Sequence, residues 1–333
     1  MHILLHSDDE SSGATQPVEA APDQPATTTP EGDVWWQDGD ERAPSSAGVI
    51  TSPLSPTSAP EDVPPSRLPV DPFVPAERGL AFAALRDIGQ VRSVNQDSVF
   101  GMVVSVPRGD SDVPVGLFVV ADGMGGHEGG EIASRIAIAT VAREIMRNLI
   151  LPSLDDAMTD SLQEIMTGAV QEANRAIWEA ARAAGSDMGT TCTAVLLIGH
   201  TVYIGHVGDS RAYLVSKDGL HAITNDHSAV GRLIQLGQIS AAEAREHPLR
   251  SHLYRTVGQM PETTVDYESF PIGAATHLLL CSDGLWGMIE EAEMLEAVQG
   301  HVWPQDVCRM LIDRANAAGG DDNISALVVM LPQ

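Results

Sequence analysis

The period of the apolar positions divides the chain into blocks of strands and helices. Two strand-like runs come first, at 80–87 (LAFAALRD) and 115–122 (VGLFVVAD). In the next two segments, apolar residues recur every three to four positions, which is the period of an amphipathic helix. These two stripes consist of Ile132, Ile136, Ala139, Met146 and Ile150, and of Leu162, Ile165, Met166, Ala169, Ala173, Ala176 and Ile177. We expect both stripes to face the protein core.

Short strand-like runs dominate the second half of the chain, at 192–199, 201–208, 211–216 and 220–224. Their joints are only a few residues long, which favours antiparallel pairing because a parallel crossover needs a dozen residues or more. A polar helical segment is predicted at 227–247, strands near 263–270 and 277–282, helices at about 290–300 and 304–318, and a last strand, NISALVVML. Because strands and helices occur in separate blocks, we expect an α+β fold with antiparallel sheets.

Composition changes near residue 78. Residues 1–78 hold 13 of the 21 prolines, together with 14 acidic and 3 basic residues. Such a segment buries too little apolar surface to offset the entropy lost on ordering. We therefore expect a disordered acidic tail at 1–78 and one globular domain at 79–333. The adjacent Trp35 and Trp36 form either a docking motif or a chance pair in an inert tail.

Charge and cysteine usage exclude several classes of protein. The chain has 46 acidic and 19 basic residues, a net charge of −27, which argues against binding nucleic acid or anionic lipid. Its apolar runs are too short for a membrane span, and its first residues lack the basic start of a signal peptide. Cys192, Cys281 and Cys308 sit in apolar settings and are spaced too widely for a CxxC site. We expect buried thiols in a cytoplasmic monomer.

The stretch FVVADGMGGHEGGEIASR, at 118–135, carries five glycines within eight residues after a strand of buried type. A P-loop would continue into Gly-Lys-Ser/Thr, but Glu131 and Ile132 follow the last glycine. A dinucleotide fingerprint requires a parallel crossover, and HEGGE lacks the second histidine of a zinc-binding helix. The glycines therefore indicate a tight turn or the close approach of a ligand.

Aspartates occur at the ends of the predicted strands. Asp97 ends the stretch RSVNQD, Asp122, Asp209 and Asp283 end or follow predicted strands, and Asp322 precedes the last one. A single aspartate in such a place is usually a turn former or a helix cap. Several carboxylates that converge on one place cannot all stay ionised without a cation between them. Ligation by oxygen alone selects Mg²⁺ or Mn²⁺ over zinc.

Eight ordered motifs resemble the metal-dependent Ser/Thr protein phosphatases of the type 2C class, in their bacterial form. They are VRSVNQDS (91–98), VADGMGGHEGGEIAS (120–134), MGTTCTAVLL (188–197), HVGDSRAYL (206–214), TNDHS (224–228), HPLRSHLYRTVG (247–258), LLCSDGLWGMI (279–289) and GGDDNISALVV (319–329). The resemblance covers about residues 80–331. It implies two antiparallel β-sheets sandwiched between pairs of helices, and hydrolysis of phosphoserine and phosphothreonine in proteins. Partners would be Ser/Thr kinases and their substrates.

The resemblance also implies a binuclear Mn²⁺ or Mg²⁺ centre. Asp122 matches the aspartate that bridges both ions, and Gly123 the glycine that gives its carbonyl, where a Cβ would crowd the ions and their waters. Asp283 and Asp322 match further ligands, and Asp97 matches a residue that binds the second ion directly or through water. A hydroxide held between the two ions would attack phosphorus in line, without a covalent phosphoenzyme.

Two further matches and two departures refine this prediction. Asp209 matches a residue that helps to hold a third, weaker ion, and Arg92 matches the arginine that clamps the substrate phosphate with its planar fork. Met124 stands where many eukaryotic members carry a histidine proposed as general acid, and His127 is a weak substitute. Gln96 replaces a frequent glutamate, so we expect an altered affinity for the second ion.

Two classes of function remain open on the sequence. One is an active phosphatase, either of broad type or specialised to antagonise one regulatory kinase. The inserted flap, residues 225–260, fits the broad type better. The other is a catalytically weak, phosphoprotein-binding regulatory module that antagonises a kinase pathway. The matched positions Arg92, Asp122, Asp283 and Asp322 are all intact, which favours the active enzyme.

Overall fold

The computed structural model describes residues 80–332 except 109, 126–128, 156–159, 241–242 and 245–246. The predicted tail with Trp35 and Trp36, and His127 in the glycine-rich stretch, lie outside these residues.

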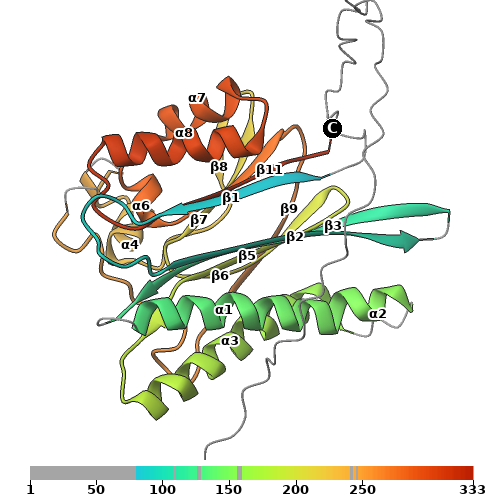
Figure 1. Cartoon of the computed structure of the whole chain (residues 1–333), viewed down its shortest axis with the longest axis horizontal. Coiled ribbons are helices and arrows are strands. Elements are labelled where there is room, and N and C mark those ends of the chain that lie inside the picture. The colour runs from blue at the N-terminus through green and yellow to red at the C-terminus, as the bar shows by residue number, and fades with distance from the viewer. Residues whose placement is uncertain are drawn as a thin grey trace, which may run out of the picture. The chain divides into compact units, whose positions relative to one another are not determined.

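Two antiparallel sheets lie face to face at the centre of the fold (Figure 1). The first has the strand order β1 (Ala81–Asp87), β11 (Ile324–Met330), β10 (His277–Cys281), β7 (Arg211–Ser216), β8 (Gly219–Ala222). The second has the order β2 (Asp97–Arg108), β3 (Ser111–Met124), β5 (Cys192–Ile198), β6 (Thr201–Val207), β9 (Asp266–Pro271), with β4 (Gly189–Thr190) paired to the end of β3. The two chain ends of the domain, β1 and β11, pair with each other.

Helices cover the outer face of each sheet (Figure 1). Over the second sheet lie α1 (Gly129–Ile145), which continues through a π-helical turn (Met146–Ile150) into α2 (Leu151–Leu154), and α3 (Leu162–Ala184). Over the first sheet lie α7 (Glu291–Gly300) and α8 (Pro304–Ala317). Two short helices, α4 (Ala229–Gln235) and α6 (Asp283–Trp286), lie outside these pairs.

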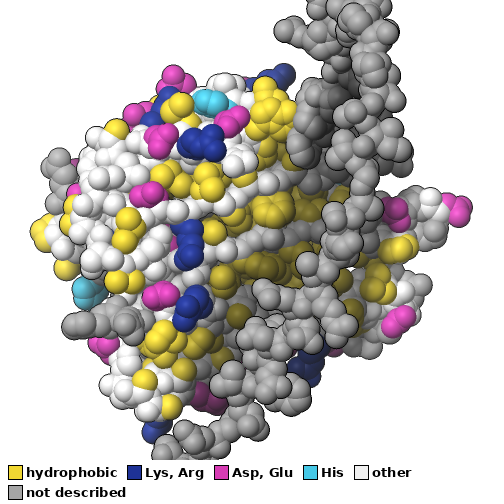
Figure 2. All heavy atoms as spheres, viewed as in Figure 1, with side chains coloured by type: hydrophobic (Ala, Val, Ile, Leu, Met, Phe, Trp, Pro, Cys, Tyr) yellow, Lys and Arg dark blue, Asp and Glu magenta, His cyan; other side chains and the backbone are white. Residues whose placement is uncertain are grey.

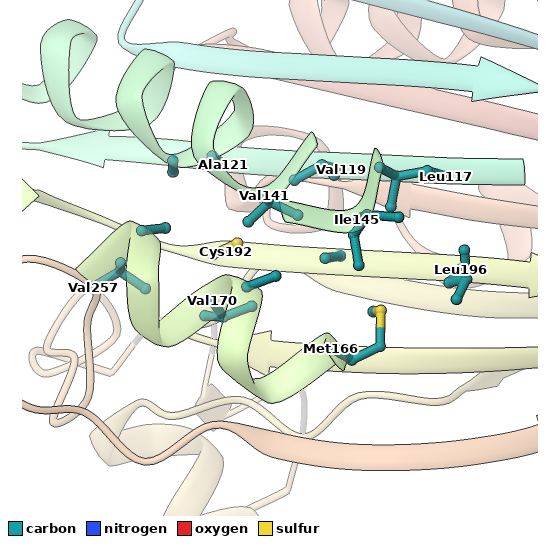
Figure 3. Close-up of a cluster of buried hydrophobic side chains, with 14 of the residues drawn as sticks. Leu117, Val119, Ala121, Val141, Ile145, Met166, Val170, Cys192, Leu196 and Val257 are labelled. Atoms are coloured by element: carbon teal, nitrogen blue, oxygen red, sulfur yellow. The ribbon is translucent and has the colours of Figure 1, made fainter. Parts of the chain in front are cut away.

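Apolar side chains fill the three interfaces between the four layers. Between α1, α3 and the second sheet, Ile145 and Met166 point toward Leu117 and Leu196 of the strands (Figure 3). A second cluster fills the space between the sheets, and a third lies under α7 and α8. The predicted αββα sandwich is confirmed. Figure 2 shows hydrophobic side chains gathered over the strands in the middle of one face, with charged side chains around them.

Several expectations from the sequence need correction. The strand β2 was not predicted, and β3 extends at both ends beyond 115–122. The helix expected at 227–247 is interrupted: α4 ends after seven residues, close to Gly237 with its left-handed φ of 66°, and among the described residues beyond Gly237 in that range Glu243 and Ala244 are helical. Of the first stripe, Ile132 is 38% exposed instead of facing the core. The three cysteines are buried and free, as expected. Within the described part of the chain, no helix is long and apolar enough to cross a membrane.

A carboxylate-lined candidate active site

The predicted site residues meet where strands of both sheets end. Asp97 and Asp122 are directly opposite each other in the pairing of β2 with β3. Asp209 lies in the connection from β6 to β7, Asp283 begins α6 after β10, and Asp322 precedes β11. A cavity of about 420 Å³ opens there. Its walls include the predicted residues Arg92, Asp122, Gly123, Asp209, Asp283 and Asp322. Asp97 is fully buried and is not among the residues that line this cavity.

The backbone of Asp122 is fixed by two threonines at the start of the neighbouring strand. Its N–H donates to Thr191 Oγ1 at 2.8 Å. Its carbonyl accepts both the Thr191 N–H and the Thr190 hydroxyl, each at 2.8 Å. These three hydrogen bonds hold the peptide groups on both sides of Asp122. The position of its Cα at the cavity is therefore fixed by the backbone and not by contacts of the carboxylate.

Gly123 explains part of the glycine-rich stretch. A Cβ at this position would come within 2.0 Å of the Gly130 carbonyl oxygen and 2.6 Å of the Gln96 carbonyl oxygen. Any side chain is therefore excluded by backbone at the start of α1 and in the loop before β2. The protein's own backbone therefore excludes a Cβ here, and the expected crowding of metal ions and their waters stays a prediction.

Asp97 is a buried carboxyl with one satisfied oxygen. Its Oδ2 accepts the Ser282 hydroxyl at 2.7 Å, and Ser282 Oγ in turn accepts the Ser325 N–H at 3.0 Å. Its Oδ1 is buried and has no hydrogen-bond partner among the described residues. Burial is the main cause that raises the pKa of Asp97 to about 7, and the nearby charges of Asp283 and Asp322 add to it.

The carboxyls of Asp122, Asp209 and Asp283 share this environment. Burial first, and then repulsion from neighbouring carboxylates, raises the pKa of each. Asp122 and Asp283 both line the cavity, and the charge of Asp283 is among those that raise the pKa of Asp122. The Oδ1 atom of Asp283, like that of Asp97, is buried without a hydrogen-bond partner among the described residues. Converging carboxyl oxygens that lack donors are suited to a hard cation.

In the described ranges, the structure contains no group of three or more His, Cys, Asp or Glu side chains placed closely enough to hold a metal ion. Mg²⁺ and Mn²⁺ are commonly held by one or two carboxylates, with carbonyls and waters in the remaining positions. Four carboxylates line the cavity, those of Asp122, Asp209, Asp283 and Asp322, together with a single histidine, His252, and no cysteine. The donor chemistry therefore fits Mg²⁺ or Mn²⁺ and does not suggest zinc.

Arg92, the predicted phosphate-binding residue, forms an ion pair with one of the cavity carboxylates. Its Nη2 lies 2.6 Å from Asp322 Oδ2, and Asp322 Oδ1 accepts the Asn323 N–H at 2.8 Å. The Arg92 side chain is 51% exposed and lines the cavity, so part of its guanidinium remains accessible to a ligand. Arg92 thus stands at the boundary between the cavity and solvent, where an entering phosphate would meet it.

Sequence reasoning missed the small polar residues that support the carboxylates. Thr191, Ser282 and Asn323 were quoted within motifs but were given no role. The Asn323 side chain accepts the Gln96 N–H at 2.8 Å and donates to the carbonyls of Ile88 and Val94, so it shapes the loop that carries Arg92. Other cavity residues were assigned no role from the sequence: Gly125, Ser251, His252, Leu253, Thr256 and Gln259. None of these six is an aspartate, glutamate, lysine or arginine, so none stood out as a candidate.

We expect Mn²⁺ to raise the melting temperature more at about pH 8 than at about pH 5.5. The pKa of Asp97 is raised from 3.8 to about 7, so the stability linked to its bound proton is lost as pH rises through about 7. A cation that replaces the proton therefore stabilises the fold more at high pH. Thermal shift with and without Mn²⁺ at each pH measures this. Burial lowers the pKa of His206 to about 4, which makes the fold more stable as pH rises. This contribution is the same with and without Mn²⁺, so it cancels when the two melting temperatures at one pH are subtracted. A gain independent of pH would contradict the prediction.

The chain is similar to known proteins in both sequence and fold. The chain matches the family described as Protein phosphatase 2C over residues 90–325. It is 33% identical over 247 residues to the serine/threonine phosphatase stp of Listeria innocua, covering 73% of this chain and 92% of that protein. The structure of the Streptococcus agalactiae serine/threonine phosphatase is similar with a TM-score of 0.62 and 32% identity, covering 76% of this chain and 100% of that one.

A further solved structure is the catalytic domain of the serine/threonine protein phosphatase PstP in complex with two manganese ions. It is 32% identical, with a TM-score of 0.60, and the match covers 75% of this chain and 97% of that one. The family match spans most of the chain, and the two antiparallel sheets between helix pairs are those that the resemblance implied. The chain therefore belongs to the protein phosphatase 2C family.

Proposed function

We propose that this protein hydrolyses phosphoserine and phosphothreonine in proteins, in a reaction that depends on Mn²⁺ or Mg²⁺. The observation that carries the proposal is the cavity in which Asp122, Asp283 and Asp322 converge beside Arg92. Such a site combines a negative pocket for cations with a guanidinium for the substrate phosphate. The family membership and the serine/threonine phosphatase relatives support the same activity.

The proposed ion ligands are Asp122, the Gly123 carbonyl, Asp283 and Asp322 for a binuclear centre. When bound, the two ions lower the pKa of a water between them and so supply a hydroxide nucleophile at neutral pH. Asp97 would act on the second ion, directly or through water, and Asp209 would help to hold a third. The two-manganese structure of PstP supports two ions in a relative, and the assignment to this chain's residues is our proposal.

The protein's own groups then bind and orient the substrate. Arg92 would hold the phosphate by charge-assisted hydrogen bonds at the mouth of the cavity. The thiols of Cys192 and Cys281 are fully buried, and burial raises the pKa of each to about 12. Neither thiol is ionised or accessible at neutral pH, which makes both poor nucleophiles. This supports direct attack by water and not a cysteinyl-phosphate intermediate.

Hydrolysis of p-nitrophenyl phosphate and of a phosphothreonine peptide, each with and without Mn²⁺, tests the proposal. We expect turnover of both compounds that requires Mn²⁺ and stops with a chelator. Binding of the phosphopeptide without turnover of either compound would favour the alternative, a phosphoprotein-binding regulatory module. Phosphorylated proteins, including Ser/Thr kinases and their substrates, are the proposed partners, and phosphoproteomics with and without the active enzyme would identify them.

We propose that the catalytic domain is residues 79–333 and that residues 1–78 are a separate tail. A protein that begins near Gly79 should fold and keep its activity on p-nitrophenyl phosphate, because every residue assigned to the site lies beyond it. Its melting temperature should stay within about 2 °C of the full chain, which corresponds to a change of about 1 kcal/mol or less for a domain of this size. A larger fall would show that the tail packs on the domain and that the boundary is misplaced.

A further inference from the structure

We propose that His227, at the base of the flap, is a positioning residue that holds the Gly208–Asp209 turn in place at the active-site cavity. The proposal rests on the proposed function, because it gives Asp209 a role in ion binding. His227 is not among the residues lining the cavity, and it would act only through Gly208.

The first observation is a reciprocal pair of hydrogen bonds between His227 and Gly208. The Gly208 N–H donates to His227 Nδ1 at 3.0 Å, and the His227 N–H donates to the Gly208 carbonyl at 2.8 Å. Both polar backbone groups of Gly208 are therefore bonded to a single residue. Asp209 is next in the chain, so the position of its Cα follows from that pair.

The second observation is that this turn has little freedom to rearrange. Gly208 has φ of 114°, and a Cβ there would lie 2.5 Å from the Thr191 Cβ. On the other side of the aspartate, the Asp209 carbonyl accepts the Trp286 indole N–H at 3.0 Å. Ser210 Oγ and Thr191 Oγ1 are hydrogen-bonded at 2.7 Å. His227 supplies the remaining hold, on the N-terminal side of Asp209.

The tautomer of His227 follows from its partners. Because the Gly208 N–H is a donor, Nδ1 must be the acceptor, and the neutral ring carries its proton on Nε2. That proton faces Asp266 Oδ2 at 3.0 Å, which is the acceptor that this tautomer needs. Arg255 also approaches Nε2 at 3.0 Å, but a guanidinium cannot accept a proton, and it donates to Asp266 Oδ1. Asp266 thus fixes the ring so that Nδ1 points at Gly208.

The same residue joins the two ends of the flap. The His227 carbonyl accepts the Tyr254 N–H at 3.0 Å, and the N–H of Ala229, two residues further on, donates to the His252 carbonyl at 2.9 Å. Asp226, the preceding residue, forms a two-point ion pair with Arg211 at 3.0 and 2.7 Å. The consecutive flap residues Asp226 and His227 therefore bind Arg211 and Gly208, which lie on either side of Asp209 in the chain.

Two substitutions separate the two ring nitrogens. His227→Asn places its Oδ1 where Nδ1 lies and keeps an acceptor for the Gly208 N–H. His227→Gln reaches the position of Nε2, keeps a donor for Asp266, and offers nothing at Nδ1. We expect His227→Gln to speed hydrogen exchange of the Gly208 amide in the metal-free protein by about tenfold or more, and His227→Asn to preserve its protection.

The same variants are then titrated with Mn²⁺, with free Mn²⁺ followed by electron paramagnetic resonance. His227→Gln should weaken the weakest Mn²⁺ site about tenfold and leave the tighter sites unchanged, while His227→Asn should bind as the natural protein does. His277→Gln is the matched control, since this partly buried histidine lies on β10 at the end remote from Asp283. It should change neither measurement.

Three outcomes would overturn the proposal. One is unchanged Gly208 exchange in His227→Gln, and another is equal loss of the weak site in the Asn and Gln variants. If neither His227 variant folds, Asp266→Asn keeps the histidine but weakens its anchor, and unchanged Gly208 exchange in that variant would also overturn it. Failure of the proposed phosphatase function is distinguishable, because hydrogen exchange is read in the metal-free protein and needs no turnover.

Discussion

Replacing Asp122 with asparagine is expected to abolish hydrolysis while leaving the fold intact. Asp122 lines the cavity together with Asp283, and Asp97 is its partner across the β2–β3 pair. Removing its charge takes away a ligand proposed to contact both ions, so kcat should fall by more than about a hundredfold. The backbone bonds to Thr190 and Thr191 do not involve the side chain and should persist.

The same substitution should stabilise the metal-free protein. Burial and neighbouring carboxylates raise the pKa of Asp122, so its ionised form costs folding free energy near neutral pH. A neutral amide removes this cost, and we expect the melting temperature to rise by about 2–4 °C without metal. Asp218→Asn, in the exposed turn between β7 and β8, is the matched control and should change neither rate nor stability. Retention of more than about a tenth of the natural rate would contradict the ligand assignment.

Replacing Arg92 with alanine should lower kcat/KM on a phosphothreonine peptide by roughly 10- to 150-fold, the equivalent of about 1.5–3 kcal/mol for a hydrogen bond to a charged group. If the contact is equally strong in the ground and transition states, KM alone rises. If it strengthens as charge moves during the reaction, kcat falls as well. Arg92→Lys should recover only part of the loss, because an ammonium cannot reproduce the planar fork.

Metal titration must accompany these kinetics, since the structure pairs Arg92 with Asp322 at 2.6 Å. If Arg92→Ala changes the Mn²⁺ affinity, part of its kinetic effect comes from losing the contact with Asp322. If the Mn²⁺ affinity is unchanged, the effect comes from phosphate binding. Arg309→Ala is the matched control, because Arg309 forms a surface ion pair with Asp306 on α8, far in the fold from the cavity. Normal kcat/KM in Arg92→Ala would show that another group binds the phosphate.

The layers of the fold were predictable because apolar period and joint length constrain them directly. The strand β2 was not, since Gly101 interrupts its pattern. A Cβ on Gly101 would lie 2.2 Å from the Phe82 ring, so the glycine makes room for an aromatic residue of the neighbouring sheet. Such a contact between distant segments leaves no mark in the local sequence. The short α4 was overestimated because Gly237 was not taken as a helix end.

The candidate site was predictable to the level of its charged residues. Aspartates beside strand termini are conspicuous, and in an antiparallel pair the start of one strand lies beside the end of the next, as Asp97 and Asp122 do. The sequence could not predict which carboxyls line the cavity and which are buried behind it. Asp97 and Asp122 are neighbours across two strands, yet only Asp122 lines the cavity. Ser282 and Asn323 escaped because serine and asparagine occur in turns throughout the chain, and only the folded backbone shows which carboxyls and loops they support.

The closed base of the flap bears on how this protein can diversify. Residues 227–229 and 252–254 are joined by backbone hydrogen bonds and by the isolated bridge between Ser228 and Leu253. Insertions, deletions or exchanges between these two anchors leave the anchors themselves in place, and with them the turn at Asp209. The segment between these anchors can therefore vary in length and sequence through evolution without displacing the turn at Asp209.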